Sequence, residues 1–325
     1  MGRRALLALA ALALLTGAPE AAAQEAYPVP GRVIRFIVPY SPGTGADILA
    51  RLAGPKLAER WKVAVVTDNR AGASGNIGAE LVANAPPDGY TFLFTATAFG
   101  TNPALNRRLP FHPVNSFAPV ALVATSAMSV LVASPVPARS LTEFIEVARR
   151  QPGALNYSSP GNGTPQHLAM ELLKLETAID LVHVPHRSSG SAMADVAGAH
   201  VQAMISSPQT AGPFVQGGSL RMLVILGSER VAAFPDVPTI REAGFSGLEV
   251  ETWYGVLAPA GTNPTVVAAL NAEINAIGRD AEFRDALAKQ GMTPAAAPPA
   301  RLGELIKNEL ARWTRVVDSA GIKAD

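Results

Sequence analysis

Two glycine-rich segments share one local pattern, in which a loop follows a β-rich stretch and leads into a helical one. They are residues 42–47 (PGTGAD) and residues 160–165 (PGNGTP). Glycine lets the backbone approach a ligand closely, and the first amides of a helix have no intrahelical acceptor. Such a helix end favours an anion by about 0.3–1 kcal/mol, or by up to about 2 kcal/mol when partly buried. Two such loops facing each other across a cleft predict a clamp for a carboxylate.

Asp47 complicates the first of these loops. An ionised carboxylate in the first helical turn itself satisfies the helix N-terminus and repels an anionic ligand at short range. We therefore expect the loop amides to contact a ligand and Asp47 to orient water. Either loop taken alone is also compatible with an ordinary strand-to-helix turn, and it is their occurrence in both halves of the chain that favours a binding site.

Other polar segments follow predicted strands, at the positions where open α/β sheets bind their ligands. They are residues 69–76, 95–97, 186–190 and 206–208. Arg187 is the best candidate for a bidentate contact to a carboxylate, and an ordinary exposed loop arginine is the alternative interpretation. Trp253 and Tyr254 could line a cleft, but we expect them to pack in the core.

The motifs give little support to an enzymatic interpretation. Residues 43–45 could begin a dinucleotide-binding fingerprint, but Ile48 occupies the position of its third glycine. Residues 72–76 (GASGN) miss the nucleophile turn Gly-x-Ser-x-Gly at their last position. The histidines between residues 167 and 200 lack a metal-ligand spacing such as His-Glu-x-x-His, so we interpret them as polar cleft or surface residues. The sequence therefore predicts no catalytic residue, no metal and no cofactor.

The composition restricts the functional classes further. The chain has 325 residues, which favours two domains, and no cysteine, which excludes disulfides, thiolate metal sites, a cysteine nucleophile and a lipidated N-terminal cysteine. Its 27 basic and 26 acidic residues provide no basic surface for nucleic acid. Recognition of an anion must therefore rest on backbone amides, hydroxyl groups, water and at most an isolated arginine.

Residues 1–23 have the features of a secretory signal peptide. Arg3 and Arg4 form a basic start, residues 5–15 form an apolar run, and residues 21–23 are alanines that suit a cleavage site. The apolar run is too short to cross the roughly 30 Å hydrocarbon core of a membrane as a helix. We therefore expect the mature protein to be exported and soluble.

Strands and helices alternate along the mature chain, which predicts an α/β fold with mostly parallel sheets flanked by helices. Strands are expected at residues 33–38, 63–67, 90–95, 129–133, 155–158, 181–184, 201–205 and 220–226, and helices at 47–61, 76–84, 166–176, 192–199 and from 264 onward. Another helix begins at Ser140, where Glu143 completes a capping box. The apolar stretches 120–133 and 250–258 are the expected crossings between two lobes. We expect residues 27–126 and 250–325 to form lobe 1 and residues 127–249 to form lobe 2.

Short motifs occur in a characteristic order over nearly the whole mature chain. They are PYSPGTGAD (39–47), Asn69-Arg70 with GNIG (75–78), PDGYT (87–91), Asn102-Pro103, FAPV (117–120), NYS (156–158), GNGT (161–164), HVP (183–185), PDVPT (235–239), APAGT (258–262) and GIK (321–323). Each motif is weak alone, but their order and spacing together are specific. On these motifs the chain resembles the Bug-type (TctC-like) periplasmic solute-binding proteins of tripartite tricarboxylate transporters.

The resemblance implies a two-lobed Venus-flytrap fold of the periplasmic-binding-protein kind, type II-like. It also implies a periplasmic protein, which we expect to be monomeric, that closes on a small carboxylate such as a di- or tricarboxylate and delivers it to a membrane permease. Carried over to this chain, the ligand contacts in lobe 1 are Tyr40, Gly43, Thr44, Gly45, Ala46, Asp47 and Thr97. Those in lobe 2 are Asn162, Gly163, Thr164 and His167.

The chain departs from the family pattern at three places. Thr44 replaces the second residue of a Gly-Gly pair, residues 186–188 (HRS) stand where the family often has Tyr-Lys-Gly, and residues 205–207 (ISS) stand where it often has Phe-Asp-Asn. The last two segments face the distal end of the ligand, so we include His186, Arg187, Ser206 and Ser207 in the predicted site. Retaining Arg187 while replacing an acidic residue with Ser206 favours a more anionic or bulkier distal group.

The predicted mechanism is binding without turnover. Open and closed states exchange about a hinge near residues 126 and 250, and a ligand that touches both lobes shifts the population toward closure. A secreted enzyme, either a hydrolase or dinucleotide-dependent, is one alternative. A sensor that reports to a membrane receptor is another, and the sequence does not separate transport from sensing.

Overall fold

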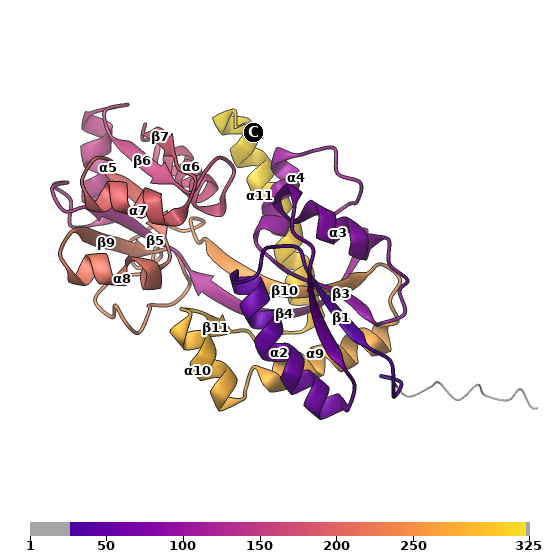
Figure 1. Cartoon of the computed structure of the whole chain (residues 1–325). Coiled ribbons are helices and arrows are strands. Elements are labelled where there is room, and N and C mark those ends of the chain that lie inside the picture. The colour runs from indigo at the N-terminus through magenta and orange to yellow at the C-terminus, as the bar shows by residue number, and fades with distance from the viewer. Residues whose placement is uncertain (1–26, 323–325) are drawn as a thin grey trace, which may run out of the picture.

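The computed structural model describes residues 27–322 and arranges them as two α/β lobes (Figure 1). Each lobe is built on one β-sheet flanked by helices. The signal peptide predicted for residues 1–23 lies outside the described residues. The predicted two-lobed α/β fold is therefore confirmed for residues 27–322.

Lobe 1 contains a six-stranded sheet in the order β11-β4-β10-β3-β1-β2. Its strands are β1 (Ile34–Val38), β2 (Val65–Asn69), β3 (Thr91–Ala96), β4 (Phe117–Ala127), β10 (Glu251–Pro259) and β11 (Thr293–Pro294). Strand β1 pairs in parallel with β2 and β3, whereas β10 is antiparallel to both β3 and β4.

Lobe 2 contains a five-stranded sheet in the order β7-β6-β8-β5-β9. Its strands are β5 (Ser129–Ala133), β6 (Asn156–Ser159), β7 (Val182–Pro185), β8 (Ala203–Ser206) and β9 (Leu220–Ile225). Here β6 pairs in parallel with β7 and β8, and β5 is antiparallel to β8 and β9. Both sheets are thus mixed rather than mostly parallel, because the strands next to each lobe crossing reverse the direction of the chain.

The helices pack on both faces of these sheets. They are α2 (Gly45–Trp61), α3 (Asn76–Ala83), α4 (Ala98–Leu105), α5 (Leu141–Arg150), α6 (Pro165–Thr177), α7 (Ser189–Ala197), α8 (Pro208–Gln216), α9 (Pro264–Ile277), α10 (Ala281–Lys289) and α11 (Pro299–Ala320). The start of α5 is as predicted, because the Ser140 side chain accepts a hydrogen bond from the Glu143 amide. The Glu143 carboxylate in turn accepts from the Arg139 amide at 2.7 Å.

Strand β1 shows why the sheet of lobe 1 is buried on both faces. Phe36 and Val38 belong to the apolar core that contains Leu49 of α2, while Ile37 belongs to a second core with Leu302 of α11. A strand covered on both faces is apolar without alternation, as residues 34–38 (IRFIV) largely are. Buried apolar side chains therefore place the sheet between two helical layers.

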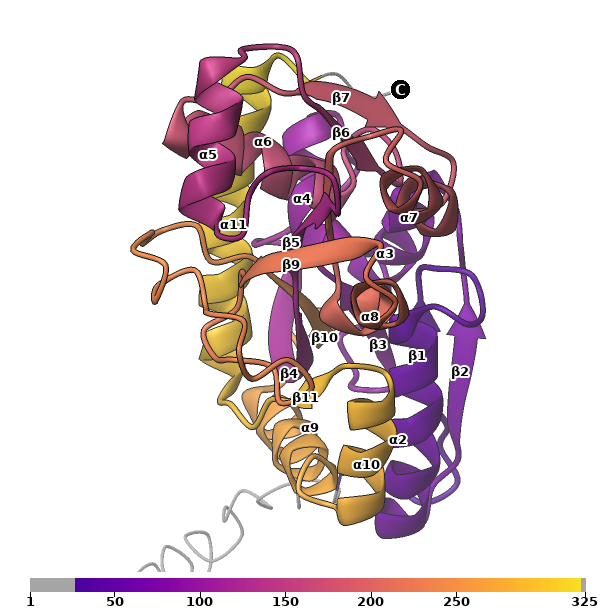
Figure 2. The ribbon, with the colours of Figure 1, turned by 90° about the vertical axis from the view of Figure 1, so that its left-hand side faces the viewer.

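Helix α11 connects the two lobes in addition to the strands. Leu302 and Ile306 near its start pack in a core of lobe 1, whereas Trp313, Val316 and Val317 near its end pack in the core of lobe 2. Figure 2 shows this helix running along both lobes. Strand β4 ends at Ala127 and β10 begins at Glu251. The exact division of the chain at residues 126 and 250 stays a prediction.

Candidate functional site

In each lobe, three helices begin at the carboxyl ends of neighbouring parallel strands, so their N-termini lie along the same side of the sheet. In lobe 1, α2, α3 and α4 begin just after β1, β2 and β3, and in lobe 2, α6, α7 and α8 begin just after β6, β7 and β8. The strand orders β3-β1-β2 and β8-β6-β7 make β1 and β6 equivalent central strands. The N-terminal end of α2 lies on the side of lobe 1 nearest lobe 2 (Figure 1). Both predicted loops therefore lie at edges where ligands bind in α/β proteins.

The first glycine-rich loop is closed by its own helix. Gly43 has a φ of 84°, and Thr44 is the N-cap of α2. The amide of Gly43 donates to Asp47 Oδ2 at 2.9 Å. The Gly43 amide is therefore already used inside the loop, and contacts of Gly45 and Ala46 with a ligand stay predictions.

Asp47 is the centre of a buried polar network. It is 3% exposed, and its Oδ1 accepts from Asn69 Nδ2 and Arg51 Nε, both at 2.9 Å. Burial alone would raise the pKa of Asp47, but the bonds from Gly43, Asn69 and Arg51 outweigh it and hold this pKa below its usual value. Asp47 thus closes its own loop and ties it to Asn69 of β2 and Arg51 of α2, while its predicted contact with water or a ligand stays a prediction.

Tyr40 and Tyr254 flank this loop. The Tyr40 hydroxyl lies 3.1 Å from Thr95 Oγ1, and burial raises the pKa of Tyr40 to about 12. A methyl group on Gly45 would come within 2.6 Å of the Tyr254 hydroxyl. Tyr254 therefore lies against the loop rather than deep in the core, unlike Trp253, which is 1% exposed as expected. The alternation of β10 is the signal that could have separated these neighbours.

Thr97 has a structural role at the start of α4. Its Oγ1 accepts from the Trp253 amide at 2.8 Å, and its own amide donates to the Trp253 carbonyl oxygen at 3.1 Å. The side chain is 1% exposed. Thr97 therefore joins α4 to β10 and positions this corner of the site, and a direct contact with a ligand stays a prediction.

The second glycine-rich loop repeats the geometry of the first. Gly163 has a φ of 68°, and Thr164 caps α6 by accepting from the His167 amide at 3.4 Å. The amide of Gly163 donates to His167 Nδ1 at 2.9 Å. His167 thus takes the place in lobe 2 that Asp47 takes in lobe 1, because each is the third residue of its helix. A Cβ on Gly163 would collide with Leu105 at the end of α4, so this loop contacts lobe 1.

The rings of His167, His183 and Tyr157 pack together beside the second loop, which is bonded to them through His167. The rings of His167 and His183 lie 3.9 Å apart and nearly parallel, and the Tyr157 ring lies 4.9 Å from His183 and 6.2 Å from His167. The Tyr157 hydroxyl donates to Glu171 Oε1 at 2.5 Å, and His183 Nε2 lies 2.7 Å from Ser159 Oγ. Burial, with a smaller contribution from His167, lowers the pKa of His183 to about 4, so this ring is neutral at pH 7.

The remaining predicted residues surround the second loop. Arg187 and Asn162 are exposed, and the Arg187 side chain has no ion pair within residues 27–322. The His186 carbonyl oxygen lies near Gly161, which brings the 186–188 segment beside the second loop. Ser206 is 5% exposed, and Ser207 caps α8 by accepting from the Thr210 amide. Roles for these side chains in ligand binding stay predictions.

Between residues 27 and 322, no helix combines the length and the apolar character needed to cross a membrane. Over the same residues, no three His, Asp or Glu side chains are grouped so that they could hold a metal ion.

Two facing lobes, each with helix N-termini at one sheet edge, define the class of two-lobed solute-binding proteins. The profile of the family described as "Tripartite tricarboxylate transporter family receptor" matches residues 49–322. The chain therefore belongs to this family, named TctC.

Individual relatives agree with this assignment. The protein BugT of Bordetella pertussis is 33% identical over 99% of each chain. The structure of Rpa4515 from R. palustris with adipate has 32% identity and a TM-score of 0.73, covering 90% of this chain and 99% of that one. MatC of Rhodopseudomonas palustris with bound malate has 31% identity and a TM-score of 0.70, covering 89% and 99%. The resemblance to Bug-type proteins is thus confirmed.

Proposed function

We propose that this protein is an exported, periplasmic solute-binding protein that captures a small dicarboxylate between its lobes and delivers it to a tripartite transporter permease. It acts as a monomer and releases its ligand unchanged, so it is not an enzyme. One observation carries the proposal: equivalent glycine–threonine loops open α2 and α6 after the middle strands of the β3-β1-β2 and β8-β6-β7 units.

The chemistry of the two loops suits a ligand with a carboxylate at each end. The first amides of each helix favour an anion. Arg187 supplies a cation without an internal ion pair beside the second loop. The relatives solved with adipate and malate are similar over about nine-tenths of this chain and hold dicarboxylates, which supports the same ligand class here.

Thermal unfolding with a panel of small molecules tests this function. Adipate and malate should raise the melting temperature, because a ligand at 100 times its Kd stabilises a protein by about 2.7 kcal/mol. Adipamide, which has the length of adipate but no charge, is the matched control and should leave the melting temperature unchanged. A rise with adipamide or a sugar, and none with any carboxylate, would contradict the proposal. Recovery of a chemically altered ligand would contradict the claim of binding without turnover.

A further inference from the structure

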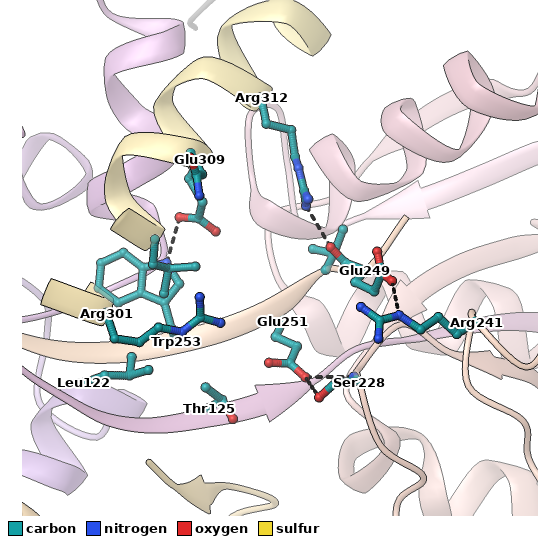
Figure 3. A pocket seen from close by; sticks show the side chains of 13 residues that line it. Leu122, Thr125, Ser228, Arg241, Glu249, Glu251, Trp253, Arg301, Glu309 and Arg312 are labelled. Atoms are coloured by element: carbon teal, nitrogen blue, oxygen red, sulfur yellow. Dashed lines mark hydrogen bonds and ion pairs between the residues drawn. The ribbon is translucent and has the colours of Figure 1, made fainter. Parts of the chain in front are cut away.

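A cavity of about 310 Å³ lies where the two lobes join, and the glycine-rich loops contribute nothing to its lining (Figure 3). Its walls come from α11, from β4 and β10, and from the segment between β9 and β10. Because residues of both lobes line it, its shape depends on how the lobes are arranged. The charged groups that face the cavity determine what it could hold.

Four of the six charged side chains in the lining have partners within the protein, and Arg241 and Glu249 are the pair of opposite charges among them. Arg241 Nε forms an ion pair with Glu249 Oε1 at 2.8 Å, and Arg312 Nη1 donates to the Glu249 carbonyl oxygen at 2.7 Å. Glu309 Oε2 accepts from Trp253 Nε1 at 2.7 Å. None of these four groups needs a ligand for its main interaction.

The two remaining charged side chains of the lining are Arg301 and Glu251, which have opposite charges. The Arg301 side chain has no hydrogen bond or ion pair with any residue from 27 to 322. Glu251 Oε1 accepts only from the amide and hydroxyl of Ser228, at 3.1 and 3.4 Å. Arg301 and Glu251 do not pair with each other, although both side chains point into the cavity in Figure 3. Among the charged groups of the lining, Arg301 is thus the cation without a side-chain partner in residues 27–322, and Glu251 is a carboxylate whose hydrogen bonds come from Ser228.

This arrangement selects among classes of small ligand. A simple anion would be attracted by Arg301 but repelled by Glu251, and a simple cation would meet the opposite problem. A molecule that carries both charges satisfies both groups, and Leu122, Leu305 and Trp253 give the cavity an apolar wall. We propose that this cavity binds the zwitterion of an apolar α-amino acid, with its carboxylate on Arg301 and its ammonium on Glu251.

The site goes beyond the proposed dicarboxylate site and does not depend on it. Arg301 belongs to the part of α11 that packs on lobe 1, while Glu251 contacts Ser228, which follows the last strand of lobe 2. An occupant thus touches both lobes next to their crossing. If the lobes rearrange around a dicarboxylate, the two ligands must alter each other's affinity by the same factor.

Calorimetric titration of the full-length mature protein with L-leucine tests the proposal. N-acetyl-L-leucine lacks the ammonium group and 3-methylbutylamine lacks the carboxylate, so each should bind at least tenfold more weakly than L-leucine. Arg301→Gln and Glu251→Gln should each weaken L-leucine binding by tenfold or more, in line with charge-assisted hydrogen bonds. Lys307→Gln, another exposed cation of α11, is the control and should leave binding unchanged.

The outcomes separate this site from the dicarboxylate site. Each variant is first shown to have the melting temperature and the adipate response of the unmodified protein, so that a folding defect is recognised. Absence of L-leucine binding overturns the proposal, as it would if Arg301 and Glu251 paired with each other in solution. Equal binding of N-acetyl-L-leucine, or affinities unaffected by both substitutions, also overturns it. A failed adipate response with intact L-leucine binding would instead contradict only the proposed function.

Discussion

Asp47 and His167 occupy equivalent positions in the two lobes but differ in charge. Each accepts a hydrogen bond from the amide of the glycine before the N-cap. Asp47 brings a negative charge to the start of α2, whereas His167 accepts through Nδ1, which carries no proton in this arrangement. The anion-binding tendency of α6 is therefore left uncompensated, while that of α2 is partly used by the protein itself.

The Asp47 network should make folding sensitive to acid. A carboxyl whose pKa is lowered in the folded state stabilises the protein above its unfolded pKa, near 3.8, and this contribution is lost as the pH falls through the folded pKa. Asp47→Asn should lower the free energy of unfolding by roughly 1–3 kcal/mol at pH 7, and the difference should shrink below pH 4. Urea titrations at pH 7 and below pH 4 measure this difference in the free energy of unfolding. Asp285→Asn, an exposed residue of α10, serves as the control.

Arg187 should distinguish ligands by the charge at their distal end. Its exposed side chain lies in the segment beside the second loop and has no internal ion pair among the described residues. Arg187→Ala should weaken adipate binding by about tenfold or more, and hexanoate binding by much less, because only adipate has a second carboxylate. Calorimetry gives both affinities, with Arg139→Ala as a control of equal charge change in lobe 2. Equal losses for adipate and hexanoate would contradict this role.

At the scale of elements, α11 links the two lobes near the point where the chain passes from one lobe to the other. Glu309 lies between the part of α11 that packs on lobe 1 and the part that packs on lobe 2. Its carboxylate accepts from Trp253 Nε1 of β10 and lies against Gly100 of α4. One buried carboxyl thus joins three elements near the crossing.

Titration of Glu309 should weaken this junction at alkaline pH. Burial, opposed by the bond from Trp253, raises the pKa of Glu309 to about 7. A raised pKa means that its stabilisation is fully present below pH 4.5 and is lost as the pH rises through 7. Glu309→Gln keeps an acceptor for Trp253 and cannot ionise, so at pH 8 it should be more stable than the unmodified protein by on the order of 2–3 kcal/mol. Glu304→Gln on the exposed side of α11 should show no such difference across the same pH range.

The elements that the sequence predicted well are those with strong local signals. Helix α5 begins after its capping serine, and β1 and β5 are largely apolar, with Arg35 and Ser129 as their polar residues. Helices α4 and α8 were not predicted, because Pro103 and Pro213 interrupt their helical patterns and packing against α11 and β9 stabilises them instead. The hydrogen bonds from the Gly43 amide to Asp47 and from the Gly163 amide to His167 could not be predicted either. A side chain that turns back onto its own loop leaves no periodic signal in the sequence.

At the scale of the whole molecule, the lobes already touch at several points. The second glycine-rich loop contacts Leu105 of α4, and Arg315 of α11 forms an ion pair with Glu176 of α6 at 2.5 Å. The first contact lies beside the predicted site, and the second lies near the C-terminal end of α11. The contact with Leu105 is made by the loop that leads into α6 and that belongs to the predicted site. A ligand that draws the lobes together would therefore have to leave this contact in place.

Gly163→Ala should therefore hinder closure as well as strain the loop. The φ of 68° disfavours alanine by about 1–2 kcal/mol, and the new methyl group would collide with Leu105 across the lobe boundary. We expect adipate affinity to fall by more than tenfold, and the contraction that adipate causes in small-angle X-ray scattering to diminish. Leu105→Ala removes the obstacle on the opposite lobe, so adding it to Gly163→Ala should restore part of the affinity and of the contraction. A double variant no better than Gly163→Ala would mean that backbone strain alone is responsible, and that this contact between lobes plays no part in closure.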